Sequence, residues 1–233
     1  MDTTILWTAY ISVIAQVITM MFGFHGWNLN VQSKYHTIKE LLILETIVQI
    51  IELVYYGWLI TSFKDITYDV TYTRYFDWML STPIMLINTG IYMKFASNPS
   101  ESNSFWKLFL ENSSKIHHMW FANLIMLMFG YLGEKKYLGK FTATLWGSLA
   151  FLYTFFVLYS FVGNEADNQT LFWFMFIVWA FYGVAYLFPY SLKNSAYNLL
   201  DIFSKNFYGM FLYFKLSSLT ENHKSSGFYI KDL

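Results

Sequence analysis

The chain has 233 residues, of which 56% are hydrophobic, 22% aromatic and only 13% charged, and its formal net charge is zero. Such a composition is typical of an integral membrane protein. Without a basic run or a phosphate-binding loop, nucleic acids and nucleotides are poor candidates for partners. The absence of cysteine excludes disulfides, thiolate metal ligands and cysteine nucleophiles. We predict neither a metal site nor an enzymatic activity.

Seven apolar stretches are long enough to cross a membrane, which takes about 20 helical residues each. We therefore predict an all-α, seven-transmembrane helix bundle that occupies residues 1–233 as one domain. Helices are expected because no stretch alternates with period two over barrel-length strands. The predicted spans are 4–28, 38–62, 72–96, 115–133, 141–163, 169–190 and 193–216.

Three further features of the sequence give weaker signals: the N-terminus, the connection between the third and fourth spans, and the distribution of lysines. Met1-Asp2-Thr3-Thr4 lacks the features of a signal peptide, so the first segment is expected to stay as a span. Residues 105–110 form either an amphipathic surface helix or an early start of the fourth span. The lysine distribution favours, without deciding, an outside N-terminus and a cytoplasmic C-terminus.

Polar residues share one face of each of the first two spans. Ser12 and Gln16 are at positions i and i+4, and Glu45, Gln49 and Glu52 are at i, i+4 and i+7. Interhelical hydrogen bonds are a sufficient explanation for Ser12, Gln16 and Gln49. They explain the two glutamates less well, because no basic residue lies between positions 40 and 63 and an isolated carboxylate at bilayer depth is costly.

The third span places Arg74, Asp77 and Ser81 on one helix face. Intramembrane Arg and Asp are costly unless they are paired or face water. Taken alone, a structural Arg74–Asp77 bridge beside a kink at Pro83 explains this pattern as well as a functional site does.

The seventh span carries the most unusual residue, Lys205, with Asp201 one turn before it. A lysine at bilayer depth costs roughly 2.5 to 3.5 kcal/mol on insertion scales. A low-dielectric pocket destabilises the charged amine and makes it nucleophilic toward an aldehyde. Asn194, Asn198 and Asp201 follow the same face toward Lys205, and Asn206 lies beside it.

A resemblance to the microbial (type 1) rhodopsins is carried by two motifs, Arg74-Tyr75-Phe76-Asp77-Trp78 with Ser81-Thr82-Pro83, and Asp201-Ile202-Phe203-Ser204-Lys205. The resemblance implies all-trans retinal bound to Lys205 as a protonated Schiff base. It also implies that Asp77 and Asp201 are the counterions, that Arg74 holds the outer half of the site, and that Ser81 tunes proton exchange with Asp77.

The polyene of such a cofactor needs a flat aromatic slot. Packing is the commoner explanation for an aromatic stripe in so aromatic a chain, but the resemblance favours a cofactor wall. Gly183 and Tyr186 replace a Pro and a Trp of the family, which puts the wavelength and the motion of the sixth helix in question. The residues expected to line the slot are Trp78, Thr82, Trp146, Trp179, Tyr182 and Tyr186.

A second departure from the family concerns proton pumping. Outward proton pumps of this family usually carry a carboxylic acid eleven residues after Asp77, and here that residue is Asn88, which cannot titrate. The two residues are roughly 16 Å apart along the helix, so no nearby acid on that helix substitutes. Efficient pumping is therefore disfavoured.

The chain is most similar to the channel-type rhodopsins of large algal and protist DNA viruses, on the basis of Glu45, Glu52, Asp201 and Asn206. This resemblance implies a light-gated conductance for protons and small monovalent or divalent cations, and rows of carboxylates select cations. We expect a multi-pass protein in a lipid bilayer, in the host cell membrane if the chain is viral, and leave a homo-oligomer open. The predicted ion pathway comprises Ser12, Gln16, Glu45, Gln49, Glu52, Asn198 and Asn206.

Two alternatives stay open. One is a light-driven outward proton pump, inefficient because it lacks a cytoplasmic donor. The other is a sensory rhodopsin, which would need an output domain or a partner surface. We expect the tail after Leu216 to be too short for an output domain.

Overall fold

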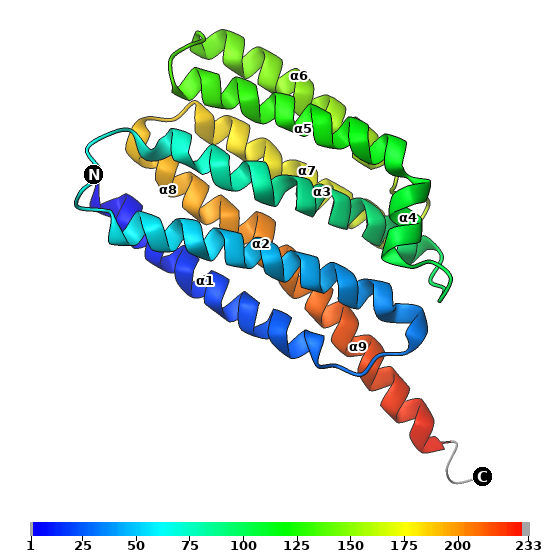
Figure 1. Ribbon diagram of the computed structural model, residues 1–233. Helices are drawn as coiled ribbons and strands as arrows, with labels where there is room; N and C mark the ends of the chain where they lie inside the picture. Colours follow the sequence, from blue (N-terminus) through cyan, green and yellow to red (C-terminus); the bar gives the residue numbers. More distant parts are fainter. Residues whose placement is uncertain (1, 230–233) are drawn as a thin grey trace.

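The computed structural model describes residues 2–229, and it describes side chains as far as Thr220. Residues 230–233, the end of the predicted tail, lie outside the described part. Apart from the short α4, the described helices form seven long helical segments, because α8, the π-helical segment η3 and α9 are continuous (Figure 1). The helices are α1 (Thr3–Trp27), α2 (His36–Thr61), α3 (Arg74–Ser97), α4 (Phe105–Glu111), α5 (Ser113–Glu134), α6 (Lys140–Tyr159), α7 (Ala166–Tyr186), α8 (Tyr190–Asp201), η3 (Ile202–Asn206) and α9 (Phe207–Tyr229), with 3-10 turns η1 (Ser33–Tyr35) and η2 (Val70–Thr73).

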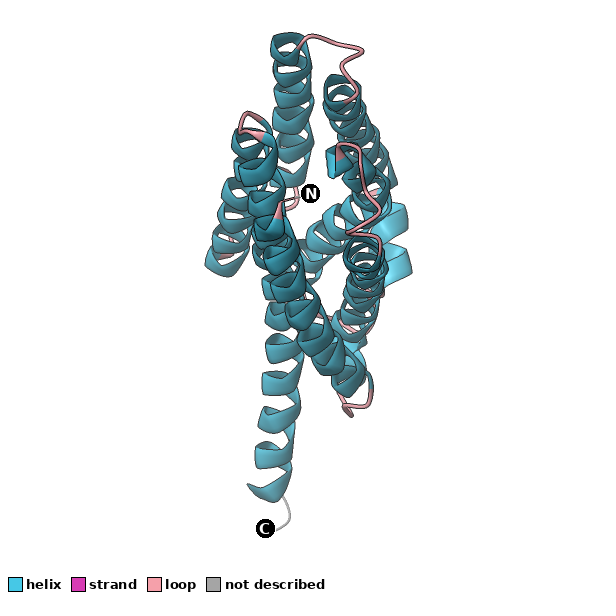
Figure 2. Ribbon diagram, turned by 90° about the vertical axis from the view of Figure 1, so that its left-hand side faces the viewer, coloured by secondary structure: helices cyan, strands magenta, loops and turns pink. Residues whose placement is uncertain are grey.

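The long helices run side by side as a bundle. α1 packs against α2 and α8, α2 against α3, α3 against α5, and α5 against α6. The end where α1 begins is called the N-terminal end here, and the end that carries α4 is called the C-terminal end. Figures 1 and 2 show α9 continuing past the rest of the bundle at the C-terminal end.

Side chains fix where several helices begin. The Asp2 carboxylate caps α1 by accepting a hydrogen bond from the Thr4 backbone N–H at 2.9 Å. It also accepts from the Ser191 hydroxyl, which joins the first turns of α1 and α8. These hydrogen bonds, with Ser191 as the largest contributor, lower the pKa of Asp2.

The boundary between the sixth and seventh helical segments differs from the prediction. α7 ends at Tyr186, a turn follows, and α8 begins directly after Pro189, whereas the predicted spans met between residues 190 and 193. Proline has no N–H to continue a helix, and it disfavours helical geometry in the residue before it. Tyr190 and Ser191 therefore belong to the beginning of α8.

The segment 97–114 contains a separate helix and not an early start of the fourth span. α4 is followed by Asn112 and then by α5. It buries Phe105 and Leu108, while Trp106 remains 66% exposed. The Glu40 carboxylate of α2 accepts a hydrogen bond from the Phe105 backbone N–H at 3.4 Å, which ties α4 to the C-terminal end of the bundle.

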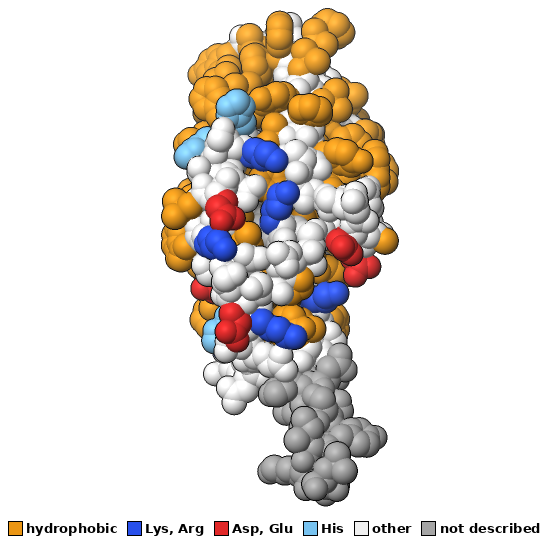
Figure 3. Space-filling view, turned by 90° about the vertical axis from the view of Figure 1, so that its right-hand side faces the viewer, with side chains coloured by type: hydrophobic (Ala, Val, Ile, Leu, Met, Phe, Trp, Pro, Cys, Tyr) orange, Lys and Arg blue, Asp and Glu red, His pale blue; other side chains and the backbone are white. Residues whose placement is uncertain are grey.

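Four of the described helical stretches are long and apolar enough by themselves to cross a membrane: α1, residues 33–61, α6 and α7. The other three long segments fall short by this measure, namely α5 and the third and seventh segments, which carry charged and amide side chains that the bundle buries. In Figure 3 the charged side chains gather over the C-terminal end, with hydrophobic side chains around them. Which end faces the cytoplasm stays a prediction from the lysine distribution.

α5, α6 and α7 approach closely at Gly133. A Cβ atom on Gly133 would overlap the Tyr186 hydroxyl and would lie 2.6 Å from the Ala143 Cβ. Gly183, in contrast, has no atom within 4 Å of an added Cβ. Of these two glycines, Gly133 is therefore the one that depends on the missing side chain.

We predict that Gly133→Ala lowers the thermal unfolding midpoint of the purified protein. Overpacking costs typically about 1–3 kcal/mol, which outweighs the gain of about 1 kcal/mol in helix propensity. Gly183→Ala is the matched control and should unfold at or above the wild-type temperature. Equal midpoints for Gly133→Ala and Gly183→Ala would contradict the close approach of the three helices.

Candidate functional site

Lys205 lies at the centre of a buried cluster of charges. Its Nζ atom is 3.3 Å from Asp77 Oδ2 of α3 and 3.2 Å from Asp201 Oδ1 of α8, and it is paired with Glu52 Oε1 of α2. All four side chains are at most 5% exposed. One amine therefore holds three carboxylates from three helical segments together.

Asp201 is the most heavily bonded of these carboxylates. The Tyr56 hydroxyl donates to its Oδ2 at 2.5 Å, and the Tyr182 hydroxyl donates to its Oδ1 at 2.7 Å. Arg74 lies 3.8 Å from the same Oδ2. The hydrogen bonds and the guanidinium stabilise a negative charge on Asp201 although the residue is buried.

Arg74 is fully buried and points toward α8. Its Nε donates to Asn194 Oδ1 at 3.0 Å, and its other nitrogens donate to Tyr56, to the Asn194 carbonyl and to Asn198 Oδ1. Among the described residues no Arg74–Asp77 ion pair is present; the arginine is paired with Asp201 instead. The structural Arg74–Asp77 bridge, which the i, i+3 spacing allowed, is therefore wrong.

The two residues before Pro83 bond carbonyls of the preceding turn of α3. The Ser81 hydroxyl donates to the Asp77 carbonyl at 3.0 Å, and the Thr82 hydroxyl donates to the Trp78 carbonyl at 2.6 Å. Asn123 of α5 donates to the Thr82 hydroxyl at 2.8 Å. The Asn123 bond therefore joins α5 to the helix that carries Asp77.

An elongated cavity of about 510 Å³ runs from Lys205 outward between α3, α5, α6 and α7. Five of the six residues predicted for the slot line it, namely Trp78, Thr82, Trp179, Tyr182 and Tyr186. The cavity walls also include Met126, Leu127, Phe151, Phe176 and Tyr197, which the sequence analysis missed because single apolar or aromatic residues carry no signal in so apolar a chain.

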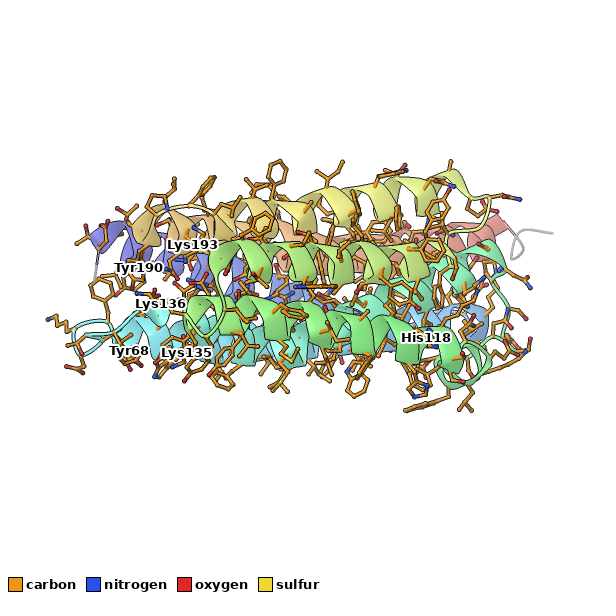
Figure 4. The ribbon with its side chains drawn as sticks, turned by 90° about the horizontal axis from the view of Figure 1, so that it is seen from above. Tyr68, His118, Lys135, Lys136, Tyr190 and Lys193 are labelled. Carbon is orange, nitrogen blue, oxygen red and sulfur yellow. The ribbon has the colours of Figure 1, made fainter. Side chains whose placement is uncertain are left out.

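Trp146 is the exception, and its assignment to the slot is wrong. The side chain is 50% exposed and lies in a different groove, on the surface between α5 and α6, with Phe129 and His118. Figure 4 places His118 near the C-terminal end. The neighbouring Gly147, and not Trp146, faces the cavity, so the register of α6 differs from the expected one by one residue.

Four of the predicted pathway residues form one hydrogen-bonded group, namely Gln16, Gln49, Glu52 and Asn206. Gln16 donates to Glu52 Oε2 at 3.1 Å, and Asn206 donates to Gln16, Thr19 and Gln49 at 2.9–3.2 Å. Gln49 donates in turn to the Lys205 carbonyl at 3.2 Å. Nearer the N-terminal end, the Ser12 hydroxyl donates to the Asn198 carbonyl at 2.6 Å.

Glu52 is not an unpaired carboxylate, although no basic residue lies between positions 40 and 63. Its Oε1 pairs with Lys205 and its Oε2 accepts from Gln16. No basic residue of α2 indicated this partner, since the lysine comes from another helix. Glu52 therefore belongs both to the charge cluster and to the polar group of α1 and α2.

Glu45 lies toward the C-terminal end, beside Asn88. The Asn88 amide donates to Glu45 Oε2 at 3.2 Å and to the Leu41 carbonyl at 3.0 Å. Glu45 Oε1 and Asn88 Oδ1 are buried and have no hydrogen-bond partner among the described residues. A carboxyl group from α2 thus lies next to the position where the third helix lacks an acid.

Tyr56 is a site residue that the sequence analysis missed, although a signal for it existed. It follows Glu52 by four residues and extends the stripe of Glu45, Gln49 and Glu52 by one more turn. Its hydroxyl bonds Asp201 and Arg74. The stripe on α2 therefore continues from the Glu45 region to the arginine.

The fold and this cluster define a seven-helix membrane protein with a buried lysine at the end of an apolar cavity. The chain matches the family described as bacteriorhodopsin-like protein over residues 1–219, and it belongs to that family. It is therefore a microbial rhodopsin of the retinal-binding type.

Solved structures support the same architecture. The viral rhodopsin OLPVRII matches with a TM-score of 0.82 and 27% identity, covering 94% of this chain and 99% of that chain. The proton pumping rhodopsin AR2 from the marine alga Acetabularia acetabulum matches with a TM-score of 0.73 and 18% identity, covering 95% and 98%. The second likeness, at this identity, concerns the fold alone.

A curated relative is a green-light absorbing proteorhodopsin from Gamma-proteobacterium EBAC31A08. It is 27% identical over 161 residues, which cover 61% of this chain and 60% of the relative. The matched region therefore spans only about three-fifths of that protein.

We predict that Arg74→Gln destabilises the protein by about 3–5 kcal/mol, because it removes one of the two cations that face three buried carboxylates. Arg74→Lys keeps the charge but cannot reach both asparagines, so it should cost about 1.5–3 kcal/mol. The measurement is the thermal unfolding midpoint. The exposed Lys107–Glu111 pair offers a control, since Lys107→Gln should change stability by less than about 1 kcal/mol. If Arg74→Gln behaves like Lys107→Gln, the buried network is not what joins α3 to α8.

Proposed function

We propose that this protein is a light-gated cation channel with all-trans retinal attached to Lys205 as a protonated Schiff base. Lys205 is the lysine that lines the apolar cavity. The cavity has the volume of a typical small-ligand pocket, about 300–1,000 Å³, and its walls are aromatic. The buried Trp179 Nε1, which has no partner among the described residues, fits a wall built to contact a ligand.

The chain's own residues account for the protonated nitrogen. Retinal, when bound, supplies light absorption and a change of shape. Asp77, Asp201 and Glu52 surround the Lys205 nitrogen and stabilise a positive charge there. Arg74 and Tyr56 hold Asp201 in place. Trp78 and Trp179 exclude water from the cavity side.

The attachment is tested by expressing protein with all-trans retinal. Wild type should show a visible absorption band, and Lys205→Ala should be colourless, because alanine has no amine to form the bond. Lys193→Ala is the control, since Lys193 is also buried but lies near the N-terminal end, paired with Glu134. A Lys205→Ala protein that keeps the band would overturn the assignment.

One observation carries the channel proposal: buried polar side chains continue along one side of η3, from Asn198 and Ser12 through Gln16, Glu52 and Asn206 to Glu45. Carboxylates along this row favour cations over anions. Arg74, the arginine of the described helices, lies at the N-terminal end of the row and is neutralised by Asp201. In the present arrangement the contacts of Glu52 with Lys205 and Gln16 close the row.

Movement of η3 would open it. Single π-helical turns inside an α-helix occur frequently at functional sites. Lys205 and Asn206 are both in η3, so a shift of this segment changes the contacts of Glu52, Gln16 and Gln49 together. Light absorbed at Lys205 is thereby coupled to the polar row.

Proton transport is the second candidate. The contact between Glu45 and Asn88 supports it, because it supplies a carboxyl group where the third helix has none. In that case Glu45 would exchange protons with the site from the C-terminal end. The name of the curated relative, a proteorhodopsin, gives no further distinction between these two functions.

Photocurrents at several holding voltages distinguish the two functions. A channel current reverses sign with the ion gradient, and a pump current keeps one sign. We expect reversal in wild type, and we expect Glu52→Gln to reduce the current or change its ion selectivity, because a neutral amide offers a permeating cation only a dipole. Glu52→Gln should also shift the absorption band to the red, since it removes a negative charge beside the nitrogen.

Glu111→Gln, at an exposed site on α4, is the control and should leave current and spectrum unchanged. A current of one sign at every voltage would reject the channel. So would Glu45→Gln and Glu52→Gln proteins with wild-type conductance and selectivity.

A further inference from the structure

The retinal cavity is open on the side of the bundle, between α6 and α7. Lys205 forms its inner end. Its lining also includes residues that are exposed at the membrane-facing surface, namely Ser148 and Leu152 of α6 and Gly183 and Val184 of α7. Leu152 is 52% exposed and Val184 is 47% exposed. The cavity therefore reaches the hydrocarbon of the bilayer.

The N-terminal end of the cavity, in contrast, is closed by polar contacts. Lys193 of α8 donates to both carboxylate oxygens of Glu134 at 2.8 and 2.7 Å, and both side chains are less than 10% exposed. Tyr186 is buried against Gly133 below this pair. Lys140 donates to the Leu187 carbonyl at 3.0 Å. Figure 4 shows Lys193 at this end, with Lys135, Lys136 and Tyr190.

We propose that retinal enters the protein from the bilayer, aldehyde first, through the opening between α6 and α7, and that Gly183 keeps this opening wide. The proposal rests on the proposed attachment of retinal to Lys205. An apolar aldehyde partitions into the bilayer, where it meets an apolar opening and no closed ion pair. Because the aldehyde has to reach Lys205 at the inner end, the bulky ring follows and ends nearest the opening.

The attachment reaction fits this direction of entry. The Lys205 ammonium first gives a proton to one of the neighbouring carboxylates, and the free amine nitrogen attacks the aldehyde carbon. A C=N bond replaces the C=O bond, the aldehyde oxygen leaves as water, and the nitrogen takes up a proton again. The carboxylates of Asp77, Asp201 and Glu52 lie within reach of this proton exchange.

Gly183 is the residue at which the opening can be narrowed without disturbing the protein. No atom lies within 4 Å of a Cβ added there, so the first side-chain atom meets no neighbour, and a longer side chain can extend into the opening that Gly183 lines. Gly57 of α2 has the same free space but does not line the cavity. It provides a matched control for the loss of a helical glycine.

The experiment follows pigment formation in membranes that contain the retinal-free protein. All-trans retinal is added in phosphatidylcholine vesicles, and the rise of the visible band is recorded. We expect Gly183→Leu to slow the rise about tenfold, which corresponds to about 1.4 kcal/mol of added barrier. Gly183→Ala and Gly57→Leu should load at the wild-type rate. All variants should form pigment when retinal is present during synthesis, and Gly57→Leu, which lies outside the cavity, should show the wild-type band.

Widening the opening gives a test that misfolding cannot imitate. Leu152→Ala and Val184→Ala remove half-exposed side chains at its edge and should speed loading. If Gly183→Leu forms no pigment even with retinal present during synthesis, these two variants decide alone, and unchanged rates overturn the proposal. Wild-type loading rates in Gly183→Leu overturn it as well. A wild type that never gains a visible band rejects the attachment to Lys205 instead.

Discussion

The charge balance around the Lys205 nitrogen constrains the rest of the bundle. Three buried carboxylates face two buried cations, Lys205 and Arg74. If all are ionised, one negative charge is left over in a low-dielectric interior, where an unpaired charge costs several kcal/mol. The charges therefore balance when Lys205 stays positive and one carboxylate holds a proton. A small movement of the nitrogen changes this balance for α2, α3 and α8 together.

The backbone that carries Lys205 is also the least regular part of the seventh segment. Residues 202–206 form a π-helical turn between two α-helices. Side chains of other helices hold it, since Gln49 donates to the Lys205 carbonyl and Asn206 donates to Gln16, Thr19 and Gln49. A segment that is positioned by side-chain hydrogen bonds can change its geometry by exchanging partners, without unfolding a helix. Ion pairs thus fix the side-chain nitrogen of Lys205, while the backbone that carries it can change its hydrogen-bond partners.

The sequence predicted the features that depend on a single helix. The seven-helix fold and the stripe of Glu45, Gln49 and Glu52 follow from length and periodicity, and the resemblance to the rhodopsins supplied five residues of the cavity wall. What it could not predict depends on pairing between helices. Arg74 pairs with Asp201 rather than with Asp77, and Glu52 finds its cation on the seventh segment. The assignment of Trp146 to the cavity wall was wrong for a different reason, because a shift of one residue in register rotates a side chain by about 100° around its helix.

Polar groups are satisfied unequally on the two sides of Lys205. Toward the N-terminal end, Arg74, Asn194 and Asn198 bond one another and the backbone of α1. Toward the C-terminal end, buried Glu45 Oε1, Asn88 Oδ1 and Asn206 Oδ1 accept no hydrogen bond from the described residues. Unpaired buried acceptors are costly unless water reaches them. Water entry is therefore favoured from the C-terminal end as far as Asn206. The Glu52–Lys205 and Arg74–Asp201 pairs form the barrier beyond it.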